Sequence, residues 1–354
     1  MKKIFVVAFL IFIINIIPVK AFYLSGESSV LMDMDSNIVL YGSNIHSRMK
    51  TASIAKVMTT IVAIENGFLS EYVKVTKESV NQIGSKIYLI EDDEILLIDL
   101  LYGLMLRSGN DAAYQIAEYV LGYDDFIIEM NEFAKRIGMK NSTFENPSGL
   151  DEETVNYSTA YDMALLMSYA MQNDVFKEIT GTRVHGCTTK TGNRYVWSNK
   201  HRLVQTEGIF TGGKTGYTKS AGRTLITTAT DGDLNLVVVT FRASSDWSDH
   251  RTLFDYGFSN FDSYPVIKAQ SLKIRNNFYD YHPYILDDIV IPLRKGSKND
   301  IDVQIHLKNS SNDFIIGKII VYLNNEILIE ENVYQRESDI IKETLVNYFK
   351  RLYL

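Results

Sequence analysis

A serine and a lysine stand three residues apart at the start of an apolar segment. The tetrad Ser53-Ile54-Ala55-Lys56 opens a run whose apolar residues recur at helical spacing as far as Gly67. Positions i and i+3 share a helix face, so the ammonium group can reach the hydroxyl. Lysine can act as the base for a serine nucleophile only if burial or nearby cations lower its pKa. The tetrad alone also fits a capped helix with a solvated lysine, but Lys56 lies among core-facing positions, where a lysine needs a reason.

A second polar group interrupts two apolar helical segments. Ser108-Gly109-Asn110 supplies a hydroxyl, a glycine that permits close backbone approach, and an amide that both donates and accepts. By itself the tripeptide would be an ordinary turn. Held beside buried surface, its hydroxyl could relay a proton and its amide could hold a substrate peptide bond.

A third group occurs twice. Lys214-Thr215-Gly216 follows two glycines and precedes a predicted strand pair. A cation, a hydroxyl and uncovered backbone would therefore line a strand, and a ligand with a terminal carboxylate could lie against it. The copy Lys190-Thr191-Gly192 is followed by Asn193-Arg194 and is typical of a hairpin turn with an exposed lysine. Spacing favours residue 214 without excluding residue 190.

Together and in this order, the three motifs resemble the signatures of penicillin-recognising serine enzymes. Longer segments resemble D-alanyl-D-alanine carboxypeptidases, the low-molecular-mass penicillin-binding proteins of the peptidase S11 type; these segments are 100–113, 146–150 and 212–218. The resemblance is strong over residues 22–262, and Tyr217-Thr218 after the third motif settles the choice of Lys214.

The resemblance implies a role for each motif. Ser53 would attack the carbonyl between two D-alanines, Lys56 would take its proton, and Ser108 would pass a proton to the departing amine. The residues expected to bind substrate are Asn110 for the donor-strand amide, Lys214 for positive field, Thr215 for the terminal carboxylate, Gly216, and Tyr217, whose N–H would form the oxyanion hole with that of Ser53. Arg242 would assist with the carboxylate.

The same resemblance implies the partners. Peptidoglycan stem peptides ending in D-Ala-D-Ala are the expected substrates. Penicillins imitate that end, so they are expected to acylate Ser53 and form an adduct that is hydrolysed slowly. A class A β-lactamase is disfavoured because no Glu-x-x-Leu-Asn segment lies between residues 111 and 213. D,D-endopeptidase or transpeptidase action, and a non-catalytic wall-peptide binder, remain alternatives.

Periodicity predicts the elements that carry these motifs. A hairpin is expected over residues 28–41, helices in the middle of the chain, and strands at 223–230 and 234–241. Strands at both ends of one segment predict an α+β domain in which the ends pair in one antiparallel sheet, the penicillin-binding-protein/β-lactamase-like arrangement. The expected units are the catalytic domain, 22–262, a small all-β domain, 265–335, and a C-terminal amphipathic helix, 338–354.

The chain ends predict an exported protein. Residues 1–21 combine lysines, a short apolar run and small residues before a cleavage point, as in a signal peptide. A transmembrane anchor is the alternative, but the apolar run is short for a bilayer, which needs ~20 residues. The terminal helix is expected to contact the extracytoplasmic membrane face through Lys350 and Arg351, with internal packing as the alternative.

Removing three lysines with the signal takes the net charge from −7 to −10, which disfavours a nucleic-acid partner. One cysteine, Cys187, and six scattered histidines show no metal-ligand spacing, so neither a metal nor another cofactor is expected.

Overall fold

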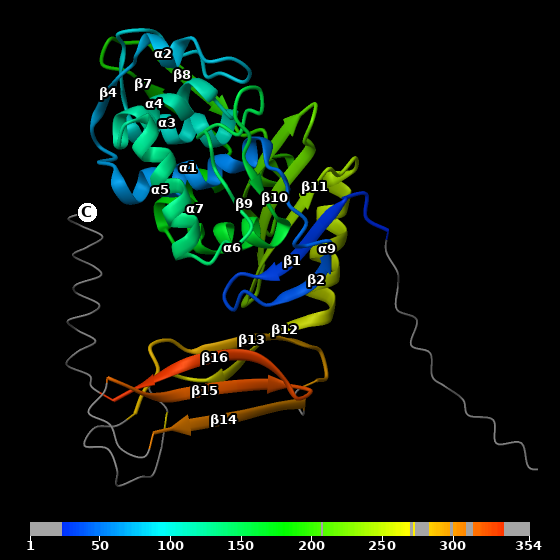
Figure 1. Ribbon diagram of the computed structural model, residues 1–354. Helices are drawn as coiled ribbons and strands as arrows, with labels where there is room; N and C mark the ends of the chain where they lie inside the picture. The colour runs from blue at the N-terminus through cyan, green and yellow to red at the C-terminus, as the bar shows by residue number, and fades with distance from the viewer. Residues whose placement is uncertain are drawn as a thin grey trace, which may run out of the picture.

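The computed structural model describes residues 23–206, 208–269, 272, 283–297, 300–308 and 314–335. A helix-rich part and a five-stranded sheet lie together, and a smaller part made of strands follows them (Figure 1). The expected signal peptide, 1–21, and the expected terminal helix, 338–354, fall outside the described residues. The α+β fold with a small all-β C-terminal region is confirmed.

The central sheet joins the two ends of the larger part. Its strand order is β2-β1-β11-β10-β9, and every pairing is antiparallel. The predicted hairpin strands pair with the late strands, from Ser28 opposite Phe241 to Asp33 opposite Leu236. The bounds are β1 (Ser28–Asp33), β2 (Val39–Ser43), β9 (Phe210–Thr218), β10 (Gly222–Asp231) and β11 (Leu234–Phe241).

Both faces of this sheet are covered, so its strands are apolar on both sides. Along β1, Val30 and Met32 pack into the main core beneath the helices, whereas Leu31 belongs to the cluster beneath α9 (Asp246–Asn260). Alternate residues of a strand point to opposite faces, which explains this division. Figure 1 shows α9 on one side of the sheet and α6 on the other. Because β9 ends the strand order, it forms one edge of the sheet.

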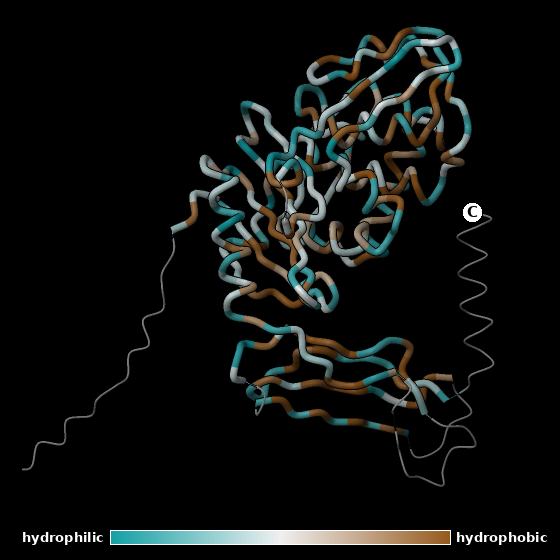
Figure 2. The backbone as a smooth tube through the Cα atoms, turned by 180° about the vertical axis from the view of Figure 1, so that it is seen from behind, coloured by the Kyte–Doolittle hydropathy of each residue, from teal (hydrophilic) through white to brown (hydrophobic). Residues whose placement is uncertain are grey.

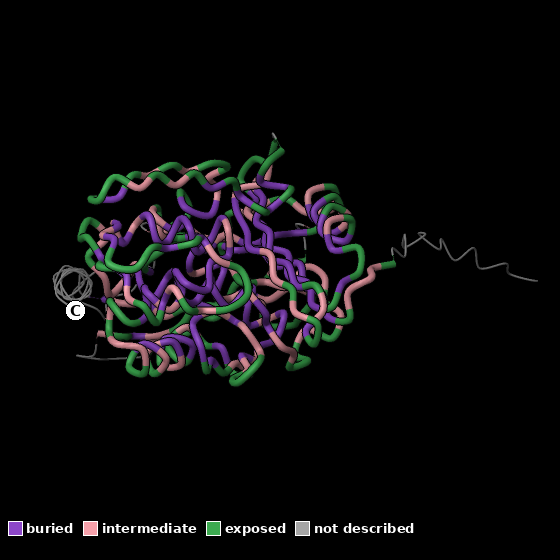
Figure 3. Tube along the Cα trace, turned by 90° about the horizontal axis from the view of Figure 1, so that it is seen from above, coloured by how far each residue is buried: buried purple, intermediate pink, exposed green. Residues whose placement is uncertain are grey.

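The helices form most of the remaining large part. Figure 3 shows the buried segments running through its middle, with exposed loops around them. The fully buried aromatic residues Phe126, Phe133 and Phe176 fill the main core. The bounds are α1 (Lys56–Asn66), α2 (Lys77–Val80), α3 (Leu97–Tyr102), η2 (Gly103–Arg107), α4 (Asn110–Val120), α5 (Tyr123–Arg136), α6 (Ala160–Ala170), α7 (Asp174–Gly181) and α8 (Arg202–Gln205).

Three short strand pairs complete the large part. They are β3 (Met49–Lys50) with β6 (Tyr157–Ser158), β4 (Tyr72–Lys74) with β5 (Glu94–Leu96), and β7 (Val184–Thr188) with β8 (Arg194–Ser198). The first pair ties the chain just before Ser53 to the segment that leads into α6. This pairing therefore fixes how the nucleophile motif enters the core.

Two features differ from the sequence-based expectation. The helix predicted from Ser53 is divided into a 3-10 turn, η1 (Ala52–Ala55), and α1, which begins at Lys56. Helix α9 was not predicted, because charged and polar residues break up its apolar pattern and only one side of it faces the sheet.

The small part consists of two antiparallel sheets. β12 (Phe261–Ile267) pairs with β13 (Ile289–Arg294), while β15 (Ile315–Leu323) lies between β14 (Ile301–Leu307) and β16 (Glu326–Tyr334). Asn324 and Asn325 both have positive φ and form the tight turn that the sequence indicated. Ile291, Ile319 and Val321 belong to its own core, and Figure 2 shows the hydrophobic stretches along these strands. β12 starts directly after α9, without an intervening linker.

Candidate active site

The 3-10 turn brings the serine and the lysine into contact. In this conformation residues i and i+3 eclipse each other more closely than in an α-helix. Lys56 Nζ lies 3.1 Å from Ser53 Oγ. Ser53 is partly exposed, whereas the Lys56 side chain is fully buried. The hydroxyl can therefore meet a ligand from solvent while its partner amine stays dry.

Lys56 is held by two further oxygen atoms. Its Nζ lies 2.8 Å from Asn110 Oδ1 and 2.5 Å from the Ser148 carbonyl oxygen. Burial, followed by the positive charges of Lys214 and Lys200, holds the pKa of Lys56 well below its ordinary value. An amine whose pKa is lowered in this way is neutral more readily than a solvated lysine, which is the condition that a lysine base requires.

The second motif lies beside the same amine. Asn110 begins α4, and its amide bridges Lys56 to the Ile83 carbonyl, which accepts from Nδ2 at 2.6 Å. Asn110 therefore orients the Lys56 amine through its side-chain oxygen. Ser108 adopts a left-handed conformation with φ 66°, and its buried Oγ forms no hydrogen bond with any residue that the structure describes. A buried hydroxyl that lacks a hydrogen-bond partner among the described residues is unusual in a folded protein.

The third motif lies on edge strand β9. Lys214 pairs with Ile226, Thr215 with Leu225 and Gly216 with Thr224. A Cβ atom added to Gly216 would lie 2.9 Å from the Ser53 backbone nitrogen, so only glycine lets the strand approach the nucleophile this closely. Thr215 is partly exposed and Tyr217 is exposed. The strand thus presents its end to solvent directly beside Ser53.

Lys214 is buried, although a lysine side chain carries a charge in water and is normally exposed. Burial, and then the charge of Lys200, lowers the pKa of Lys214 from 10.5 to about 7. Its Nζ donates to the Thr215 carbonyl at 3.0 Å. The cation therefore lies close to the site, where its field is screened less than at the surface.

The duplicate motif lies elsewhere. Lys190-Thr191-Gly192 forms the turn between β7 and β8, as the hairpin interpretation predicted. Its lysine side chain is 51% exposed and pairs with Glu94. This turn contacts the strand pair of Glu94 and not Ser53, so residue 214 is the copy that reaches the site.

Two contributions to the site were not recognised in the sequence. The Ser148 carbonyl that contacts Lys56 is a backbone group, which no side-chain pattern reveals. Asp111, fully buried, accepts from the backbone nitrogen atoms of Ile87, Tyr88 and Leu89 and so holds the loop that precedes β5. The position of Asp111, directly after Asn110 and inside a helix, was the available signal, because a buried carboxylate needs partners.

Arg242 and Cys187 lie in contacts that do not involve Ser53. Arg242, expected to assist with a carboxylate, donates to the Ser220 carbonyl at 2.8 Å and pairs with Glu27 at 3.3 Å.

Cys187, which has no metal-ligand spacing in the sequence, lies beside Asp99 and His185. The atoms of these three side chains that could bind a metal lie within 4.8 Å of one another. His185 Nε2 and Asp99 Oδ1 already form a 2.6 Å hydrogen bond, and burial raises the pKa of Cys187 to about 12, which disfavours the thiolate that a metal would need.

Comparison with known proteins places this geometry in a family. The sequence profile described as D-alanyl-D-alanine carboxypeptidase, peptidase S11, matches residues 18–245. The D-alanyl-D-alanine carboxypeptidase DacF of Bacillus subtilis is 29% identical over 92% of this chain and 88% of its own length.

Two solved structures extend the comparison to three dimensions. Penicillin-binding protein 5 of Haemophilus influenzae matches 90% of this chain and 98% of its own with a TM-score of 0.77; at 24% identity this shows the fold. The DD-transpeptidase of Streptomyces K15 is 29% identical, with a TM-score of 0.64 over 68% of this chain and all of its own. The chain belongs to the D-alanyl-D-alanine carboxypeptidase family and is a serine-type peptidase with the penicillin-binding fold.

Proposed function

We propose that the protein removes the terminal D-alanine of peptidoglycan pentapeptides through an acyl-enzyme on Ser53. The observation that carries this proposal is the buried Lys56 amine, which lies 3.1 Å from Ser53 Oγ. Family membership supports the substrate, and the motif residues on β9 and α4 supply groups suited to a peptide with a free carboxylate.

The reaction proceeds in two steps at one carbonyl carbon. Ser53 Oγ attacks the carbonyl between the two D-alanines, and its proton passes to Lys56. As the carbon–nitrogen bond breaks, Ser108 gives a proton to the leaving amine and takes the proton held by Lys56, so that Lys56 is neutral again. Water then attacks the ester carbonyl and gives a proton to Lys56. Lys56 returns that proton to Ser53 Oγ as the ester carbon–oxygen bond breaks, which releases the shortened peptide and restores the Ser53 hydroxyl. The N–H groups of Ser53 and Tyr217 stabilise the oxyanion in both steps.

The remaining motif residues bind the substrate. Asn110 offers its second amide hydrogen to the donor peptide, Thr215 binds the carboxylate of the leaving residue, and Lys214 supplies positive field. Gly216 leaves the backbone of β9 uncovered, so that an extended peptide can lie along this sheet edge.

The experiment that tests this function uses a soluble pentapeptide ending in D-Ala-D-Ala. Free D-alanine and a tetrapeptide are the expected products, and mass spectrometry distinguishes them from a cross-linked product when an acceptor amine is added. Transpeptidation is the second candidate, because the Streptomyces K15 enzyme to which the chain is similar is a DD-transpeptidase. Predominantly cross-linked product would favour that activity over carboxypeptidase action.

The pH dependence should report the two buried lysines. Lys56 must be neutral to accept a proton, whereas Lys214 must be charged to attract a carboxylate. Because the pKa of Lys214 is lowered to about 7, its charge is lost as pH rises through that value, and kcat/KM should fall on the alkaline side. In Lys214→Arg the guanidinium stays protonated, so this fall should disappear. An unchanged alkaline limb in the variant would assign the limb to another group.

We also propose that the protein acts at the extracytoplasmic face of the membrane, with 1–21 as its signal peptide and 338–354 as its membrane-contacting helix. The peptidoglycan substrate lies on that side of the membrane. Among the described residues, no helix is long and apolar enough to span a bilayer. Truncation after residue 337 is expected to move the mature protein from the membrane fraction to the soluble fraction, and continued membrane association would refute the anchor.

A further inference from the structure

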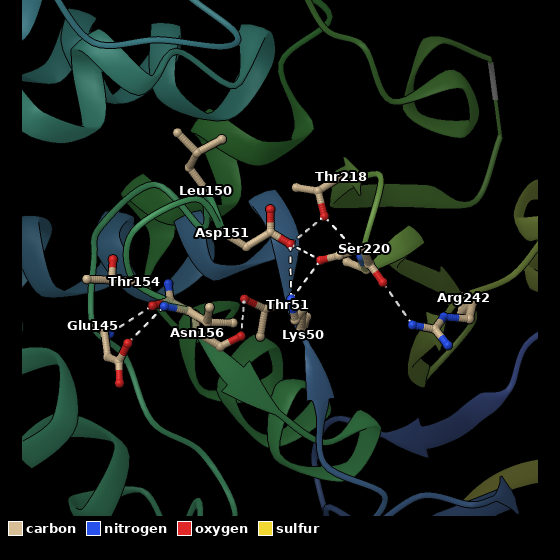
Figure 4. Close-up of polar contacts among 12 residues, drawn as sticks. Lys50, Thr51, Glu145, Leu150, Asp151, Thr154, Asn156, Thr218, Ser220 and Arg242 are labelled. Atoms are coloured by element: carbon tan, nitrogen blue, oxygen red, sulfur yellow. Dashed lines mark hydrogen bonds and ion pairs between the residues drawn. The ribbon is translucent and has the colours of Figure 1, made fainter.

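A carboxylate lies where three segments of the active site meet. Asp151 Oδ2 accepts hydrogen bonds from the hydroxyl of Thr218, at 2.8 Å, and from that of Ser220, and it pairs with Lys50 Nζ at 3.8 Å. Lys50 Nζ also donates to Ser220 Oγ at 2.9 Å. Figure 4 shows these four side chains converging, and we call them the Asp151 clamp.

Two partners of Asp151 belong to segments that carry a motif. Lys50 ends β3, three residues before Ser53, and the following Thr51 is fixed by Asn156 and Thr224. Thr218 ends β9, directly after Tyr217, while Ser220 lies in the turn to β10. The clamp therefore connects the chain entering the nucleophile with the end of the edge strand.

The loop that carries Asp151 holds the third segment, the one around the base. Ser148 in this loop contacts Lys56 Nζ through its carbonyl oxygen. The next residue, Gly149, has φ 74°, and a Cβ atom there would lie 1.9 Å from the Ala52 carbonyl oxygen. The loop thus sits directly on η1, and Asp151 extends from it to β9.

The Asp151 clamp connects the β9–β10 turn to the loop of Asp151, whereas other contacts maintain the conformation of the turn itself. Thr218 Oγ1 also accepts from the Ala221 nitrogen at 3.0 Å, and Arg242 donates to the Ser220 carbonyl. These contacts close the turn without Asp151. The Asp151 side chain is 11% exposed and that of Lys50 is 29% exposed, so the pair is only partly screened by water. Burial raises the pKa of Asp151, but hydrogen bonds from Ser220 and Thr218, together with Lys50, leave it lowered, so the group is charged at neutral pH.

We propose that Asp151 is a positioning residue for acyl transfer: it sets the distance between the end of β9, with the Tyr217 N–H, and Ser53. The inference rests on the proposed function, because it assigns that N–H to the oxyanion. Displacing a reacting group by about 1 Å can cost ~10²-fold in rate, and losing one oxyanion donor costs ~10²–10³-fold. The contacts of Asp151 are with Thr218, Ser220 and Lys50, none of which is assigned to substrate binding, so its loss should affect kcat more than KM.

The test compares Asp151→Ala and Asp151→Asn with a matched control. Asp249 is also a buried carboxylate, and it accepts from Ser25 and Gly26 in a contact remote from Ser53. The measurements are the second-order rate constant of acylation by a fluorescent penicillin, kcat and KM for D-alanine release, and Tm. Asp151→Asn preserves the side-chain shape and serves if the alanine variant fails to fold.

The clamp predicts a defined pattern of results. For Asp151→Ala, acylation and kcat should fall ~10- to 100-fold with KM changed less than ~3-fold, and Asp151→Asn should show a smaller loss. Asp249→Ala should lower Tm and leave the acylation constant of the folded protein unchanged. Adding Ser220→Ala to Asp151→Ala should cost less than the two single losses combined, because both remove the same contact.

Three results would overturn the proposal: acylation at the wild-type rate in Asp151→Ala, a loss confined to KM, or a change confined to Tm as in the Asp249 control. Failure of the proposed function is seen separately, in the wild-type protein. If wild type forms no adduct on Ser53, the function itself is wrong. If wild type forms the adduct and Asp151→Ala forms it equally fast, only the clamp is wrong.

Discussion

Ser53→Ala is expected to abolish D-alanine release, lowering kcat by about 10⁴-fold or more, as removal of an acyl-enzyme nucleophile does. The fold should persist because, among the described residues, the one side-chain hydrogen bond of Ser53 Oγ is its contact with Lys56. Binding of the pentapeptide should also persist, since the groups on β9 are untouched. The measurement is D-alanine release under saturating substrate, together with equilibrium binding and Tm.

A matched serine variant separates this loss from general damage. Ser36, in the turn between β1 and β2, donates to Asp33 and lies outside the site, so Ser36→Ala should retain full activity. Undiminished D-alanine release by Ser53→Ala would remove Ser53 from the mechanism and leave the family motif without its proposed chemistry.

Lys56→Met should have the second largest effect, a fall in acylation of about 10²–10⁴-fold, the range that a general base contributes. Methionine matches the length and burial of the lysine but cannot accept a proton. Stability is subject to two opposing changes: Asn110 Oδ1 and the Ser148 carbonyl lose a donor, while the free-energy cost of burying an amine disappears. Because these two changes oppose each other, the variant should fold. A melting curve measured together with the kinetics checks this.

The duplicated motif gives the control for lysine removal. Lys190 lies in the β7–β8 turn, exposed and paired with Glu94, so Lys190→Met should leave acylation at the wild-type rate. Acylation by Lys56→Met at the rate of this control would show that another group takes the Ser53 proton.

The sequence predicted the fold because its strongest patterns are local. The apolar runs of β10 and β11, the hairpin near Asp35 and the paired asparagines at 324–325 each indicate an element within a few residues. Pairing of the first and last sheet strands followed from their order along the chain. Helix α9 was missed because polar residues obscure its apolar face, whose partner strands lie far away in sequence.

The motif side chains could be predicted, whereas the groups that position them could not. The three motifs do converge on Ser53 and Lys56, and the fold brings β9 within reach of the Ser53 nitrogen. Ser148 contributes a backbone oxygen, and Asp151 contacts residues far away in sequence at the ends of β3 and β9, so neither leaves a signal in residue spacing. The 3-10 turn at Ser53 likewise packs against Gly149, which lies almost a hundred residues later, and residue spacing gives no sign of this contact.

The proposed acyl-enzyme on Ser53 is tested most directly by incubating the intact mature protein with benzylpenicillin and mapping the modified peptide by mass spectrometry. We predict one penicilloyl group per chain, on the peptide that contains Ser53, formed by wild type and absent from Ser53→Ala. An adduct on another residue, or no adduct in folded wild-type protein, would contradict the account.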